Sequence, residues 1–128
     1  MLKLLRTVGW SLLCLAAGGS LALAHHSANA EYDVEKMLSI DGVIEQIRDI
    51  NPHAQWTLKV KLPAGTTADW LFDSQPLTGL RRQGLSVKSD LKIGTTVTVQ
   101  YSPRRDGTGG GVLRVITVGG KTYRMGAN

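Results

Sequence analysis

Residues 54–62 read AQWTLKVKL, and this stretch decides the fold. Its apolar side chains occupy the even positions from Ala54 to Leu62, and its polar side chains occupy the odd positions. A period of two places every apolar group on one face of a β-strand, so that one face is buried and the other meets solvent. We therefore predict a domain built from amphipathic strands around one core.

Further strands are predicted on both sides of this stretch. Residues 37–50 predict a strand whose apolar positions change phase near Gly42, which indicates a β-bulge, and Asn51-Pro52 ends it in a turn. Residues 76–84 predict one short helix, with Ser74 as its cap, Pro76 in its first turn and Gly84 at its end. The other predicted elements are strands over 68–73, 97–101 and 112–118, a loop over 103–111 and an extension of the sheet over 121–123.

The order of these elements indicates the architecture. Three strands, one short helix and two more strands form the layout of a small five-stranded OB-type barrel, an all-β fold with the helix between strands 3 and 4. A small open β-sandwich is the alternative, because periodicity does not report closure. We assign the barrel domain to residues 37–128 and a polar N-terminal arm to residues 25–36.

The N-terminus has the pattern of a signal peptide over residues 1–24. Lys3 and Arg6 precede an uncharged, mostly apolar run, and Ala22-Leu23-Ala24 supplies an A-x-A cleavage site. A membrane anchor is the alternative, since the run approaches the ~20 residues that span a bilayer. Cleavage after Ala24 would remove Cys14, the one cysteine, and give a periplasmic or secreted protein with no stable membrane anchor.

Charge adds little to this picture. The full chain has 15 basic and 10 acidic residues, a net charge of +5. Without Lys3 and Arg6 the mature chain keeps 13 basic residues and a net charge of +3. A balance this mild does not specify an acidic partner.

The three histidines are the candidate metal ligands. His25 and His26 would be the first two residues of the mature chain, and His53 stands at the start of the second strand. A free α-amine loses its proton near pH 8, so the amine and ring of His25 can chelate one ion. A second ring from His53 would complete a planar three-nitrogen set, which suits Cu(II) first and zinc second.

Other ligand sets remain open. The amine, the backbone nitrogen and the ring of His26 would form a square-planar site without His53. Oxygen ligands are available nearby at Glu31, Asp33 and Glu35. Cleavage one or two residues away from Ala24 would remove the His25 chelate altogether.

The chain resembles a family of small exported bacterial proteins of unknown function. The resemblance rests on His25-His26-Ser27, Glu31-Tyr32-Asp33, Asn51-Pro52-His53-Ala54, and the segments 80–84 and 91–94, and it covers nearly all of residues 25–128. The chain departs from the pattern at Ala28, where an aromatic residue is common, and at Gln55. The family implies an exported, OB-like domain and brings no established activity.

A metal-free function is the alternative to metal binding. The strand surface around Trp56, together with Arg81 and Arg82, would then bind an envelope protein or an anionic surface. We expect no nucleic-acid partner, because the alternation places most aromatic side chains on core faces and export separates the protein from cytoplasmic nucleic acid. No catalytic constellation is identified, so we expect a binding protein and not an enzyme.

Overall fold

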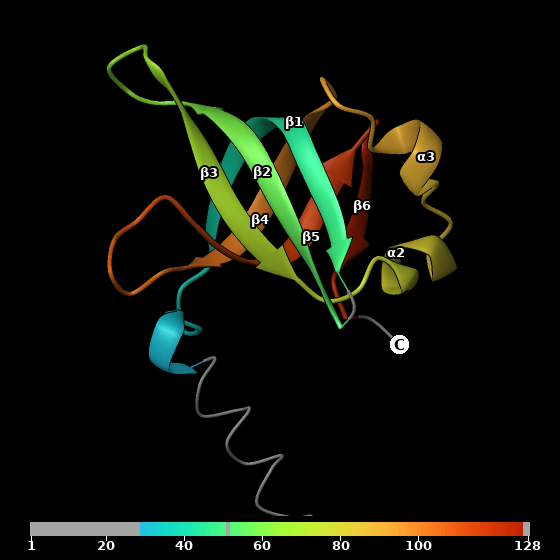
Figure 1. The fold of residues 1–128 in the computed structure, drawn as a ribbon, viewed down its shortest axis with the longest axis horizontal. Helices are drawn as coiled ribbons and strands as arrows, with labels where there is room; N and C mark the ends of the chain where they lie inside the picture. The colour runs from blue at the N-terminus through green and yellow to red at the C-terminus, as the bar shows by residue number, and fades with distance from the viewer. Residues whose placement is uncertain (1–28, 51, 127–128) are drawn as a thin grey trace, which may run out of the picture. The chain divides into compact units, whose positions relative to one another are not determined.

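The computed structural model describes residues 29–50 and 52–126, and six strands account for most of them (Figure 1). The strands are β1 (Leu38–Ile50), β2 (His53–Lys61), β3 (Thr67–Ser74), β4 (Thr96–Pro103), β5 (Gly110–Val118) and β6 (Lys121–Arg124). Two short helices, α2 (Thr78–Arg82) and α3 (Val87–Asp90), lie between β3 and β4.

The chain divides into two units, residues 1–31 and residues 32–128. In the first unit the described residues are 29–31, which are helical. The second unit contains the barrel and begins at Tyr32, five residues before the boundary that the sequence suggested. The predicted signal peptide and both N-terminal histidines lie outside the described residues.

A closed sheet forms the barrel. Antiparallel pairing links the strands in the order β3-β2-β1-β4-β5-β6. A parallel contact then joins Leu71–Asp73 of β3 to Gly110–Val112 of β5 and closes the ring. This closure confirms the five-stranded barrel and rules out the open sandwich, with β6 adding a short edge strand, as the 121–123 pattern indicated.

Strand β2 has the alternating burial that its sequence predicts. Along β2 every second side chain is buried, and Trp56 and Leu58 are fully enclosed. The core that gathers around them draws on all the main strands and on the helical segment. Its fully buried large members are Trp56, Phe72, Ile44, Leu58, Leu77, Leu80, Leu113, Ile116, Val60, Val97 and Val99.

The bulge in β1 falls three residues later than the sequence suggested. The register between β1 and β2 shifts between Ile44 and Gln46, so that both Ile44 and Ile47 turn toward the core. Gly42 has a different role, since a Cβ there would lie 3.1 Å from the Cβ of Leu58. Gly42 therefore allows β1 and β2 to approach closely, and Glu45 occupies the bulge.

The segment between β3 and β4 forms two short helices instead of one. Leu77, Leu80, Leu85 and Leu91 anchor it in the core. Ser74 does not cap α2: its hydroxyl accepts a hydrogen bond from Trp56 Nε1 at 2.9 Å and donates one to the Gln75 carbonyl at 2.8 Å. Burial of Trp56 explains the difference, because an enclosed indole N–H must find an acceptor.

Gln83, at the end of α2, binds the edge strand β6. Its side-chain Nε2 donates to the Arg124 carbonyl at 2.7 Å, and its Oε1 accepts from the Arg124 backbone N–H at 2.9 Å. One side chain thus satisfies both backbone groups of Arg124.

The glycines at the closing contact generate a stability prediction. A Cβ on Gly110, whose φ is 114°, would overlap the carbonyl oxygen of Leu71 across the parallel pair. We expect Gly110→Ala to lower the free energy of unfolding by about 3 kcal/mol or more, because both the backbone conformation and the pairing are lost. Urea unfolding followed by tryptophan fluorescence measures this change.

Gly107→Ala is the matched control. Gly107 has a φ of 79°, but no atom lies within 4 Å of its added Cβ. Only the cost of the left-handed backbone applies, about 1 kcal/mol. Equal losses of unfolding free energy in the two variants would show that the close contact between Gly110 and Leu71 does not limit the residue at position 110.

Candidate functional site

Tyr32 fixes the end of the N-terminal arm to the barrel. Its backbone forms an isolated antiparallel bridge with Arg104, and the next N–H, of Asp33, donates to the Pro103 carbonyl at 2.9 Å. The Tyr32 side chain is 7% exposed, so the ring is part of the folded unit. The predicted arm is therefore an ordered part of the barrel unit from Tyr32 onward.

Asp73 on β3 is the acceptor that holds this contact together. Its Oδ2 accepts from the Tyr32 hydroxyl at 2.6 Å and from the Arg104 guanidinium at 2.8 Å. Its Oδ1 accepts from Gln55 Nε2 at 3.3 Å. Arg104 also lies over the Tyr32 ring, 5.2 Å from its centroid, which adds a cation–π contact. We call Tyr32, Gln55, Asp73 and Arg104 the tyrosine anchor.

His53 is exposed and lies beside the tyrosine anchor. It is the first residue of β2, and Gln55 follows two positions later, so both side chains stand on the outer face of the strand. Asp73 pairs directly with Gln55 across the sheet. The outer face at this end of β2 thus carries an available imidazole next to a fixed polar cluster.

The described residues do not themselves complete a metal site. Within residues 29–50 and 52–126, no group of three His, Cys, Asp or Glu side chains is placed to hold an ion. His25 and His26 lie outside this range. Of the three predicted ligands, the structure therefore places His53 alone.

The predicted metal-free ligand surface needs correction at Trp56. This side chain is 0% exposed and its Nε1 is bonded to Ser74, so it cannot contact a ligand. Its even position on β2 points into the barrel, as the alternation required. Arg81 is at the surface, where it forms an exposed ion pair with Asp49 at 3.2 Å, and Arg82 is also exposed.

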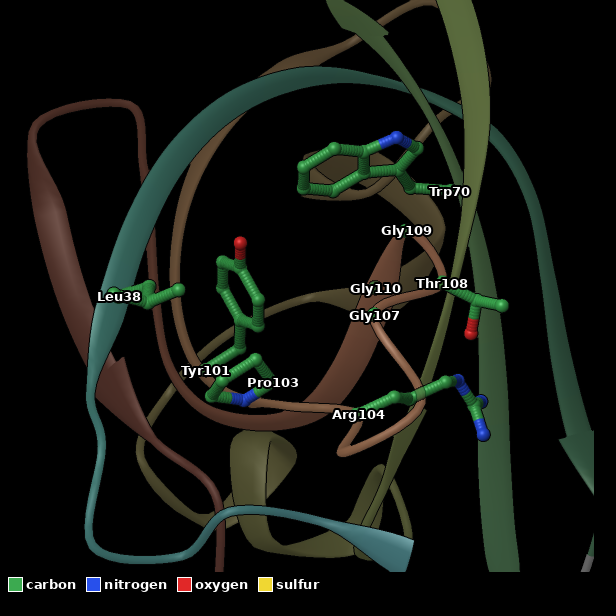
Figure 2. Close-up of a pocket in the computed structure, with 9 residues that line it drawn as sticks. All are labelled: Leu38, Trp70, Tyr101, Pro103, Arg104, Gly107, Thr108, Gly109 and Gly110. Atoms are coloured by element: carbon green, nitrogen blue, oxygen red, sulfur yellow. The ribbon is translucent and has the colours of Figure 1, made fainter.

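A cleft of about 390 Å³ opens at the mouth of the barrel, near the start of β1 (Figure 2). Its walls are side chains from three strands together with the loop between β4 and β5. The lining residues are Leu38, Trp70, Tyr101, Pro103, Arg104, Gly107, Thr108, Gly109 and Gly110.

Sequence reasoning did not find this cleft. It placed most aromatic side chains on core faces, and Tyr101 is in the core with Trp70 packed against it, but it could not tell which core positions lie at the open end of a barrel. The hairpin connection predicted over 103–111 does join β4 and β5, but it is shorter than predicted, since Pro103 ends β4 and Gly110 and Gly111 begin β5. The run of glycines beside Trp70 was the available signal, because glycine often marks close approach of backbone to an aromatic ring or ligand.

The pKa values of two ionisable groups near the cleft differ from their usual values. Burial raises the pKa of the Tyr101 phenol, which favours its neutral form. The backbone N–H and the hydroxyl of Thr108 donate to Asp106 and lower the pKa of that carboxyl. Asp106 thereby stabilises the turn that leads to Gly109.

The closed five-stranded barrel, with its helical segment between β3 and β4, belongs to the OB-fold class. Within that class, residues 12–114 match the model of a family of unknown function, DUF6152, and the chain belongs to this family. The predicted resemblance to a family of unknown function with an OB-like domain is thus confirmed. No curated protein matches the chain.

Solved structures share the fold at low sequence identity. A mitochondrial single-stranded DNA binding protein from S. cerevisiae, Rim1, is similar with a TM-score of 0.50 and 13% identity, over 65% of this chain and 92% of its own. The N-terminal domain of PriB from Thermoanaerobacter tencongensis gives a TM-score of 0.47 and 16% identity, over 66% of this chain and 96% of its own.

The first of these neighbours corrects one prediction. We expected no nucleic-acid partner, and that exclusion is contradicted, since a protein with this fold is a single-stranded DNA binding protein. The exclusion rested on inward-facing aromatic residues and on export. The barrel fold alone neither requires nor rules out inward-facing aromatic residues or export.

Within residues 29–50 and 52–126, no helix combines the length and the apolar character that crossing a bilayer requires.

The tyrosine anchor can be tested by removing one hydroxyl. We expect Tyr32→Phe to lower the free energy of unfolding by about 1 kcal/mol, because the Asp73 carboxylate loses a charge-assisted hydrogen bond. Limited proteolysis should also cleave faster near residue 32. Urea unfolding and mass spectrometry of the fragments measure the two effects.

Lys36→Ala is the control for this experiment. Lys36 pairs with Asp33 at 3.1 Å, but its side chain is 67% exposed, and we expect no measurable change in the unfolding midpoint. If Tyr32→Phe matched the control in both measurements, Asp73 would not be what holds the arm.

Proposed function

We propose that this protein is exported to the periplasm and binds Cu(II) there through its mature amino terminus. The ligands would be the α-amine and ring of His25 together with the ring of His53. The observation that carries the proposal is the exposed position of His53 on the outer face of β2, beside the residues that anchor the arm.

The sequence of the terminus supports this function. Cleavage after Ala24 would make His25 the first residue, and only a terminal histidine offers an amine and its own ring nitrogen to one ion. Three nitrogen ligands in a plane favour Cu(II) over other divalent first-row ions, with zinc as the second choice.

The tyrosine anchor supports the participation of His53. Tyr32 is bonded to Asp73, Asp73 pairs with Gln55, and Gln55 is two residues from His53, a rise of about 7 Å along the strand. His25 precedes Tyr32 by seven residues, and with residues 29–31 helical this link reaches at most about 20 Å. The covalent link is therefore long enough for His25 and His53 to share an ion.

Binding, delivery or sensing of the metal is the proposed activity. An alternative ligand set, the amine with the backbone nitrogen and ring of His26, would bind Cu(II) without His53. The alternative function is a metal-free binding module of the cell envelope. Its partner could include single-stranded nucleic acid, in view of the DNA-binding neighbour with the same fold.

Copper titration of defined termini tests the proposal. The protein is purified after export, and mass spectrometry verifies that it begins at His25. We expect 1:1 Cu(II) binding that weakens by about 100-fold or more when Gly-Ser-Gly-Ser precedes His25 and moves the α-amine away from both histidine rings, since even outer-shell partners of metal ligands contribute about 10- to 100-fold in affinity. Isothermal titration and electron paramagnetic resonance measure affinity and nitrogen coordination.

Two histidine variants separate the ligand sets. His53→Ala should weaken Cu(II) binding by a similar factor, whereas His26→Ala should change it little. The reverse result would assign the site to His26. Equal copper affinity of the native and the Gly-Ser-Gly-Ser-extended terminus would refute both sets, and unchanged cellular function of His53→Ala would favour the metal-free module.

A further inference from the structure

The cleft at the mouth of the barrel plays no part in the proposed copper site. Its volume of about 390 Å³ falls within the range of small-molecule sites, and barrel mouths are a common location for them. Figure 2 shows Leu38 and Tyr101 on one side of the opening, the glycine loop on the other and Trp70 across from Tyr101. The polar groups and the fixed shape of the cleft indicate which class of ligand it can bind.

Trp70 is held in place on two sides. Its ring contacts Phe72 at a centroid distance of 6.4 Å and Tyr101 at 6.3 Å, the latter in an edge-to-face arrangement of 75°. Gly109 lies so close to the indole that a Cβ there would overlap Nε1, Cδ1 and Cε2. The wall of the cleft is therefore preformed, which reduces the entropy lost on binding.

Tyr101 brings an unused hydrogen-bonding group to the cleft. The residue is 5% exposed, and its hydroxyl points into the space between Leu38 and Trp70 (Figure 2). No hydrogen bond joins this hydroxyl to another described residue, and since no buried polar atom among them lacks a partner, the hydroxyl reaches the solvent in the cleft. A ligand that carries an acceptor would satisfy it.

The charge around the cleft disfavours cations. No Asp or Glu is among the described residues that line it. Arg104 lies at its border, with its guanidinium bonded to Asp73 and directed away from Tyr101 (Figure 2). A positively charged ligand would find no carboxylate in this lining to pair with, because the nearby Asp73 is already paired with Arg104.

The geometry points to a binding site in this cleft for a small planar aromatic molecule that is uncharged or carries one negative charge. The ring packs against Trp70 and Leu38, and an acceptor on the ligand takes the hydrogen bond of the Tyr101 hydroxyl.

A free small molecule fits the site better than a nucleic-acid strand. Strand binding needs aromatic platforms beside a continuous basic groove. The outward-facing positions of β2 and β3 carry no Trp, Tyr or Phe side chain, His53 supplies their one aromatic ring, and they include acidic groups. They are His53, Gln55, Thr57, Lys59 and Lys61 on β2, and Thr67, Asp69, Leu71 and Asp73 on β3.

A matched set of three probes tests the proposal by nuclear magnetic resonance, with a chelator present to keep copper out. We expect 2-naphthoate to shift the amide signals of Gly107, Gly109 and Gly110, with a dissociation constant on the order of 1 mM. Its non-planar analogue decahydro-2-naphthoate should bind about tenfold more weakly because it loses aromatic packing against Trp70. The cationic analogue 2-(aminomethyl)naphthalene should also bind about tenfold more weakly, because its ammonium is partly buried without a carboxylate partner. Oligo(dT) is titrated in parallel.

Variants locate the binding. Tyr101→Phe keeps the wall and removes the hydroxyl, so we expect affinity for 2-naphthoate to fall about three- to tenfold. Trp70→Leu should reduce it about tenfold or more. Ile93→Ala, at a side chain that is 74% exposed and does not line the cleft, is the control and should leave affinity unchanged. Amide spectra of each free variant confirm that it is folded.

Three results would overturn the proposal. The first is equal affinity for 2-naphthoate and its non-planar analogue. The second is unchanged affinity in a folded Trp70→Leu variant. The third is a cleft whose signals respond to oligo(dT) and not to 2-naphthoate, which would assign it to a nucleic-acid strand. The copper experiment can succeed or fail independently of all three.

Discussion

Backbone contact between β3 and β5 holds the barrel closed, and the rest of the structure depends on it. The contact joins three residues of each strand, Leu71–Asp73 and Gly110–Val112. It forms only because Gly110 and Gly111 carry no Cβ, since a side-chain carbon at either position would overlap a carbonyl oxygen of a neighbouring strand. Without this parallel pair the sheet would have two open edges and a core exposed along one side.

The same contact positions both candidate sites. Asp73, the last residue of β3 in the pair, accepts the hydrogen bonds of the tyrosine anchor. Trp70 stands immediately before the pair, and Gly109, immediately before Gly110, packs against its indole. The anchor and the cleft share Arg104 and both adjoin this contact between β3 and β5, so the geometry of each depends on it.

Much of the fold could be predicted, because alternation along a strand is a local property. The pattern of residues 54–62 identified β2 and its buried face, and the order of elements identified the barrel class. The bulge and the helical segment were less well predicted. The bulge follows Ile44 because both Ile44 and Ile47 face the core. The Ser74 hydroxyl, which was expected to cap the helix, instead accepts a hydrogen bond from Trp56. Both outcomes depend on packing between distant segments.

The sites were harder to predict than the fold. His53 could be selected from its sequence context, and the structure places it at the surface. Trp56 was assigned to a surface that its own strand period buries. The sequence pattern does not predict the cleft, because Leu38, Trp70 and Tyr101 come from three strands and meet only when the barrel closes. Tyr32 looked like part of a polar arm, although its partner Asp73 lies 41 residues away in the chain.

The hydrogen bonds of Gln83 have a consequence for the behaviour of the protein in crowded solution. A short edge strand normally presents its N–H and C=O groups to any passing chain, and strand addition between copies is one route to aggregation. At Arg124 the Gln83 amide already occupies both groups, much as a neighbouring strand would. The Gln83 side chain, at the end of the five-residue helix α2, thus protects the exposed edge strand β6 from pairing with a strand of another copy.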